Sequence, residues 1–203
     1  MVGTVTGMVQ MVQAIQKSVT RVCWTRDRYI AAYHAGLLPE QTELIAGDIV
    51  EVPIPDPIHE AAIRALMQVL LKAFIAESTV VCEKSTPIAL SPIDQPVTDF
   101  VVMRQDLELY RNDHPQPDDI YLAVEVANSH PERDRKIKLP QYAAGNVQEY
   151  WVVDLQRREL WVCRHPNNSD YTFQQGWQDE RISLLRLPQI AINLKPFYDW
   201  LML

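Results

Sequence analysis

Asp99-Phe-Val-Val-Met103 and Tyr121-Leu-Ala-Val-Glu125-Val-Ala127 are two apolar stretches that each carry a single carboxylate. Their apolar and β-branched residues predict two buried strands, with Asp99 opening the first and Glu125 inside the second. A carboxylate in such a run is costly unless it is paired, hydrogen-bonded or bound to a cation. On neighbouring strands, the two carboxylates can share one hard divalent ion through oxygen ligands, with water completing the coordination.

A lysine in the next segment can join these two acids. In Asp134-Arg-Lys-Ile-Lys138-Leu-Pro-Gln-Tyr142, a helix over about 131–144 places Asp134, Lys138 and Tyr142 on one face. Hydrolysis of a phosphodiester needs such a set, because a metal ion activates the attacking water and a lysine stabilises the developing negative charge or orients that water. Pro140 predicts a kink near Lys138.

A purely structural interpretation of the same residues stands beside the catalytic one. Asp99 can cap its strand or accept backbone hydrogen bonds, and Glu125 can pair with a buried arginine. The face formed by Asp134, Lys138 and Tyr142 can be an ordinary solvated helix surface, since structural ion pairs occupy such positions as well. The residues by themselves leave both interpretations open.

The rest of the chain predicts one α+β domain over residues 23–203, after a leader at 1–22 that is either helical or poorly ordered. We expect a helix from Thr25 to about residue 35 and a second from His59 to about Ala76, with two short strands turning around Gly47 between them. The further strands are expected at 79–82, 87–90, 99–103, 120–127, 149–154, 159–164 and 171–174, with a helix at 131–144 and a closing helix at 196–203.

Composition excludes several classes of function. The 203 residues are 47% apolar, which suits one domain with a sizeable core. The glycines have neither the spacing of a dinucleotide-binding fingerprint nor that of a phosphate-cradling loop, so no nucleotide cofactor is expected. Three distant cysteines argue against disulfides and thiolate zinc sites. No apolar run reaches membrane-spanning length and no basic secretion signal precedes Lys17, so we expect a cytoplasmic protein without membrane contact.

Seven motifs in a fixed order carry a resemblance to a known family. The chain resembles the Uma-two family of restriction-endonuclease-like proteins, within the PD-(D/E)XK nuclease superfamily, from about Trp24 to Leu201. The matching stretches are Trp24–Tyr29, Glu43–Asp48, Pro57–His59, Asp99–Val102, Glu125–Ser129, Asp134–Tyr142 and Glu149–Asp154. The resemblance implies a mixed central sheet flanked by helices, with the active site where the sheet splays.

The resemblance also implies roles for individual residues. Asp99 and Glu125 would bind Mg²⁺ or Mn²⁺, and Lys138 would complete the catalytic set. Glu43, His59 and Tyr142 would be accessory residues of the same site. DNA would be the substrate, and a homodimer would cut its two strands.

Two positions depart from the pattern of the superfamily. Ala127 stands where the simplest pattern has lysine, so the resemblance places that lysine on the following helix at Lys138. Thr98 stands where a proline commonly precedes the aspartate, and that proline shapes backbone rather than doing chemistry. The net charge of −7 argues against tight non-specific DNA binding without a metal ion. The alternative function is a non-catalytic module that keeps the fold in order to bind nucleic acid or protein.

Overall fold

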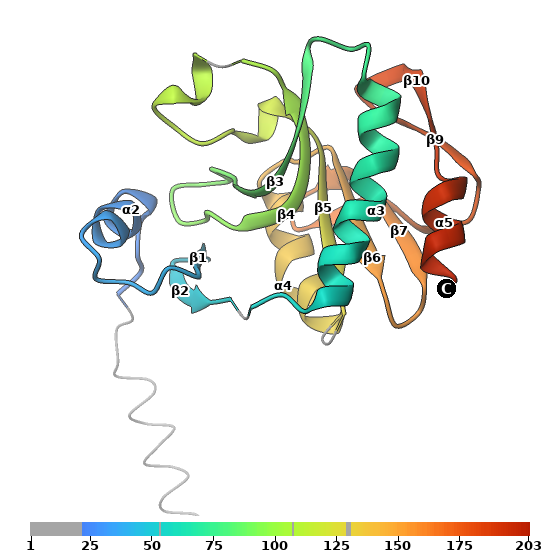
Figure 1. Ribbon diagram of the computed structural model, residues 1–203. Helices are drawn as coiled ribbons and strands as arrows, with labels where there is room; N and C mark the ends of the chain where they lie inside the picture. The colour runs from blue at the N-terminus through green and yellow to red at the C-terminus, as the bar shows by residue number, and fades with distance from the viewer. Residues whose placement is uncertain (1–21, 53, 107, 129–130) are drawn as a thin grey trace, which may run out of the picture.

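A mixed six-stranded sheet forms the centre of the protein (Figure 1). The structure is a computed structural model that describes residues 22–203, except residues 53, 107 and 129–130 and the side chains of 131–136. The strand order is β3-β4-β5-β6-β7-β8; β5 and β6 are parallel, and the other neighbours are antiparallel. The strands are β3 (Val80–Pro87), β4 (Val97–Arg104), β5 (Ile120–Ala127), β6 (Glu149–Asp154), β7 (Glu159–Asn167) and β8 (Asp170–Trp177). The predicted α+β fold is confirmed.

Helices and two small hairpins surround this sheet. Before it come α2 (Arg26–His34), β1 (Thr42–Ile45), β2 (Asp48–Glu51) and α3 (Pro57–Phe74). Within and after it come the short 3-10 helices η1 (Leu109–Arg111) and η2 (Pro117–Asp119), then α4 (Pro131–Ala144), β9 (Arg181–Leu184), β10 (Leu187–Asn193) and α5 (Lys195–Leu201). In Figure 1, α2, β1 and β2 lie together on the side of the sheet where β3 and β4 are found.

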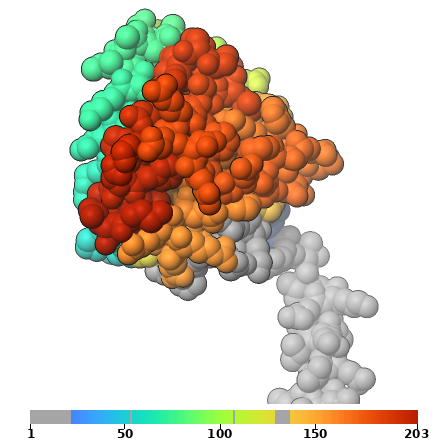
Figure 2. Space-filling view, turned by 90° about the vertical axis from the view of Figure 1, so that its right-hand side faces the viewer, coloured from blue at the N-terminus to red at the C-terminus, as the bar shows by residue number. Residues whose placement is uncertain are grey.

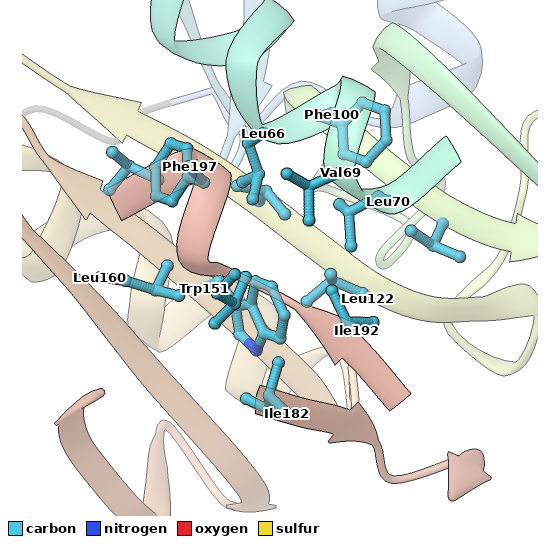
Figure 3. Packing of buried hydrophobic residues seen from close by; sticks show 14 of the residues in the cluster. Leu66, Val69, Leu70, Phe100, Leu122, Trp151, Leu160, Ile182, Ile192 and Phe197 are labelled. Carbon is cyan, nitrogen blue, oxygen red and sulfur yellow. The ribbon is translucent and has the colours of Figure 1, made fainter. Parts of the chain in front are cut away.

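Alternation along the strands sends apolar side chains to both faces of the sheet. On one face, α3 and α5 pack over the sheet with the β9–β10 hairpin, around Leu66, Trp151 and Phe197 (Figure 3). Figure 2 shows this C-terminal segment, in red, beside α3, in green. On the other face, Leu139 and Tyr142 of α4 pack over the sheet. Glu125 lies between Ala123 and Ala127, so it shares the α4 face with them.

The N-terminus of α3 is fixed by its own sequence. The Asp56 side chain accepts a hydrogen bond from the backbone N–H of His59, and Pro57 occupies the first turn, where no backbone donor is needed. Apolar residues at helical spacing then bury one side of the helix against the sheet. His59 therefore sits in a rigid first turn at one end of the core.

One expectation about the strands is wrong, and one hairpin was missed. The segments 79–82 and 87–90 are not two separate strands: one strand, β3, spans Val80–Pro87, and its ladder with β4 ends at the pair Pro87↔Val97. Pro96 has no N–H to continue the ladder. The β9–β10 hairpin was not expected, because Leu185 and Arg186 join its strands without a Gly, Pro or Asn signal.

The predicted leader lies outside the described residues, apart from its last position. Within the described part of the chain, none of the helices has both the length and the apolar character needed to span a membrane.

Candidate active site

Strands β4 and β5 separate at one end of the sheet. Their backbone pairing stops at Phe100↔Val124, although β4 continues beside β3 to Val97 and β5 continues beside β6 to Ala127. The two strands therefore diverge within the sheet. The structure places Asp99 and Glu125 at this divergence.

Side chains of β4 replace the missing backbone bonds. The hydroxyl of Thr98 donates to the carbonyl of Val124 over 3.1 Å, and the N–H of Val126 donates to Asp99 Oδ2 over 2.7 Å. A buried backbone group left without a partner would be costly, so these two bonds stabilise the opened end of the sheet. Asp99 is thereby held against the strand that carries Glu125.

Lys138 reaches this end of the sheet from α4. Its ammonium donates to Glu125 Oε2 over 3.0 Å, to Glu43 Oε1 over 3.2 Å and to the carbonyl of Val97 over 3.2 Å. The side chains of Glu43 and Glu125 are only 5% and 3% exposed, respectively. The three bonds match the three N–H groups of an ammonium. We call the group Glu43, His59, Asp99, Glu125, Lys138 and Tyr142 the acid–lysine cluster.

The charges of the cluster keep Lys138 protonated. Burial alone would lower the pKa of Lys138, but the carboxylates of Glu125, Glu43 and Asp99 outweigh it, so the pKa lies well above its usual value. The side chain is therefore a permanent cation at neutral pH. Such a group can stabilise negative charge, but it cannot accept a proton from water.

Tyr142 supports Glu125 from the next turn of α4. Its hydroxyl donates to Glu125 Oε1 over 2.8 Å, and its side chain is fully buried. Burial, together with the charge of Glu125, raises the pKa of Tyr142 far above its usual value, so the phenol stays protonated and keeps donating. Both oxygens of Glu125 are thus held by groups on α4.

We expect Tyr142→Phe to lower the free energy of unfolding by about 1.5–3 kcal/mol, the usual contribution of a hydrogen bond to a charged group. The substitution removes only the hydroxyl and leaves Glu125 Oε1 without this donor. Urea denaturation measures the change. Tyr33→Phe is the matched control, because that hydroxyl is on a 40% exposed residue at 3.4 Å from its acceptor. Equal stability of the two variants would contradict the role given to Tyr142.

His59 reaches Asp99 from the first turn of α3. Its Nε2 lies 3.1 Å from Asp99 Oδ2. Burial alone would raise the pKa of Asp99, but the hydrogen bond and charge of His59, with the charge of Lys138, hold it below its usual value. Burial alone would lower the pKa of His59, and Asp99 raises it above the usual value. Asp99 is therefore an ionised carboxylate.

Glu43 joins β1 to the cluster. Its Oε1 accepts from the N–H of Val97 over 3.1 Å as well as from Lys138. Val97 thus contributes both its backbone groups, one to Glu43 and one to Lys138. This ties the N-terminal hairpin to the opened end of the central sheet.

The donor set fits a hard divalent cation. Both bonds of Asp99 use Oδ2, and no group among the described residues bonds to Oδ1. Its side chain is 22% exposed, more than those of Glu43 and Glu125. Mg²⁺ commonly takes one or two carboxylates and keeps several waters. Within the described part of the chain, no three His, Cys, Asp or Glu side chains form a complete metal site.

The six residues to which the resemblance gives roles in the site therefore meet at one place. Glu43, Glu125, Lys138 and Tyr142 form one connected set of bonds, and His59 bonds to Asp99 beside it. The side chain of Asp134 lies outside the described residues. The sequence did not reveal Asn128, whose amide donates to the carboxylate of Asp56 and links the end of β5 to the start of α3. The only feature of the sequence that could have pointed to Asn128 is its position three residues after Glu125.

Comparisons with known proteins identify the family and the fold. A family model, Uma2, described as "Putative restriction endonuclease", matches residues 34–195. Among solved structures, the crystal structure of "a putative nuclease belonging to DUF820" from Anabaena variabilis ATCC 29413 is similar in fold, with a TM-score of 0.65 and 15% identity. The similarity covers 87% of this chain and 98% of that chain. No curated protein matches.

Proposed function

Because the chain belongs to the Uma2 family, we propose that it is a metal-dependent endonuclease that hydrolyses phosphodiester bonds of DNA. The observation that carries this proposal is the meeting of Asp99, Glu125 and Lys138 where β4 and β5 diverge. Two acids and a permanently charged lysine at one end of the central sheet are what this hydrolysis needs.

Each residue has a distinct task in this proposal. Asp99, through Oδ1, and Glu125 would hold Mg²⁺ or Mn²⁺, which when bound polarises the phosphate and lowers the pKa of water. Lys138 stabilises the negative charge that develops on the phosphoryl oxygens. His59 and the N–H of Val126 hold Asp99 in place through Oδ2.

Glu43 and Tyr142 position the other two groups. Tyr142 fixes the carboxylate of Glu125, and Glu43 fixes the ammonium of Lys138. Neither needs to touch the substrate, so both are positioning residues. Their loss should lower the rate less than loss of Asp99, Glu125 or Lys138.

One observation favours the alternative, a non-catalytic module that binds nucleic acid or protein. The acids of the cluster already have partners within the protein: Glu43 and Glu125 pair with Lys138, and Asp99 pairs with His59. In that alternative these pairs only stabilise the fold. Binding of nucleic acid or protein would then be independent of divalent ions.

Plasmid cleavage with Mg²⁺, Mn²⁺ or EDTA separates the two functions. We expect supercoiled DNA to be cut with either ion and to stay intact in EDTA. Glu125→Gln should abolish cutting, because the amide keeps the shape of the side chain but loses the charge. Glu180→Gln is the matched control, since Glu180 is 63% exposed at its side chain and lies outside the cluster. Intact DNA in every condition would contradict the nuclease proposal.

A further inference from the structure

A second feature of the protein lies next to the acid–lysine cluster. A pocket of about 420 Å³ opens between α2 and the segment that joins β4 to β5. Arg26 of α2 and Asp113 of that segment form an ion pair at 2.8 Å, which ties the two walls together. The volume lies in the range of sites that take small organic molecules. We call it the tyrosine pocket.

Five aromatic rings line the tyrosine pocket. They come from α2 and from the β4–β5 segment: Tyr29, Tyr33, His34, Tyr110 and His114. The hydroxyl of Tyr29 is fixed by the carbonyl of Thr42 at 2.6 Å, and that of Tyr110 by the carbonyl of Arg104 at 2.8 Å. Both rings are thereby held in fixed positions in the wall of the pocket.

Gln95 is a buried polar residue in the wall of the same pocket. Its backbone is fixed to Leu44 by two hydrogen bonds, and the residue is only 5% exposed. Among the described residues, nothing bonds to its side-chain oxygen, which is buried. Buried polar groups are nearly always hydrogen-bonded. A ligand with a donor at its edge would satisfy this carboxamide.

The tyrosine pocket and the acid–lysine cluster share a wall. Val97 lines the pocket, while its carbonyl accepts from Lys138 and its N–H donates to Glu43. Thr42 also lines the pocket, directly before Glu43 in β1. The tyrosine pocket therefore lies directly beside the acid–lysine cluster.

We propose that the tyrosine pocket binds one unpaired nucleobase of the nucleic acid strand that the cluster cleaves. The ring would stack on the aromatic side chains, and the carboxamide of Gln95 would bond to its edge, as glutamine does with adenine in DNA recognition. The role as a substrate pocket rests on the proposed nuclease function. If a base binds in this pocket, the substrate must have a single-stranded or flipped-out nucleotide next to the bond that is cut.

Binding of single nucleotides to the full chain tests this proposal. Adenosine, guanosine, cytidine and thymidine 5′-monophosphates are titrated in EDTA by calorimetry, with ribose 5-phosphate as the probe that lacks a base. We expect saturable binding of at least one nucleotide and none of ribose 5-phosphate. Gln95→Met and Tyr33→Ala should each weaken binding by about tenfold. Gln175→Met, at an exposed position of β8, is the matched control and should bind normally.

The outcomes separate this proposal from the nuclease function. Binding that depends on Gln95 or Tyr33 supports the pocket, even if plasmid cleavage by the same preparations fails. If the protein cleaves DNA but binds no nucleotide, the pocket proposal is wrong and the nuclease proposal is unaffected. The same conclusion follows if Gln95→Met, Tyr33→Ala and Gln175→Met all bind nucleotides equally well. Equal binding of ribose 5-phosphate also overturns it. Tyr33 is 40% exposed, so the Tyr33→Ala variant should stay folded. It can therefore test the pocket even if Gln95→Met unfolds the protein.

Discussion

Asp99→Asn is expected to lower kcat/KM for Mg²⁺-dependent DNA cleavage by about 100- to 1,000-fold, the usual range for loss of one electrostatic group in an active site. The amide oxygen can still accept the hydrogen bonds from His59 and from the N–H of Val126. The fold should therefore survive. What the substitution removes is the negative charge that would hold the cation.

Metal binding and cleavage are measured together for this variant. Calorimetric titration with Mn²⁺ should show that affinity falls in Asp99→Asn and persists in Asp118→Asn, a matched change at an exposed residue of η2. Circular dichroism checks that both variants are folded. If Asp99→Asn cuts DNA at a rate within tenfold of the wild-type rate, Asp99 does not bind the catalytic ion.

Most of the fold could be predicted from the sequence, because hydrophobic periodicity is a local signal. The helix α3 shows apolar residues at helical spacing after a capping aspartate, and β5 is an apolar run with one interruption. The hairpin β9–β10 lacked such a signal. Its inward residues Ile182, Leu184 and Ile192 are buried only because α3 and the sheet supply the surface.

The acids of the site could be found from the sequence, but their connections could not. Asp99 and Glu125 were conspicuous as charges in apolar runs, whereas Lys138 was placed by the spacing of a helix and by family resemblance. No local pattern predicts that Lys138 bonds to Glu43, 95 residues away in the chain. Such a bond depends on how β1 packs against the opened end of the sheet.

The tyrosine pocket could not be predicted at all. Tyr33, Gln95 and Tyr110 come from three separate segments and show no motif between them. Gln95 looks like an ordinary loop residue before Pro96. Only the tertiary structure shows that it is buried and that its side-chain oxygen has no partner among the described residues.

Lys138→Met is expected to lower the free energy of unfolding by about 3–5 kcal/mol, because breaking a buried ion pair from one side leaves uncompensated charge. The side chain of Lys138 is 14% exposed, and its ammonium lies within 3.2 Å of both Glu43 Oε1 and Glu125 Oε2. Without it, two carboxylates that are almost fully buried repel each other. Urea denaturation at neutral pH measures the loss.

Adding Glu43→Gln distinguishes this charge effect from lost packing. In the wild-type background, Glu43→Gln should destabilise the protein, because it removes a partner of Lys138. In the Lys138→Met background it should stabilise the protein, because it removes one of two repelling charges. This reversal of sign is a coupling that independent sites cannot produce. If Glu43→Gln destabilises both backgrounds equally, the two residues do not interact and the acid–lysine cluster does not act as a unit.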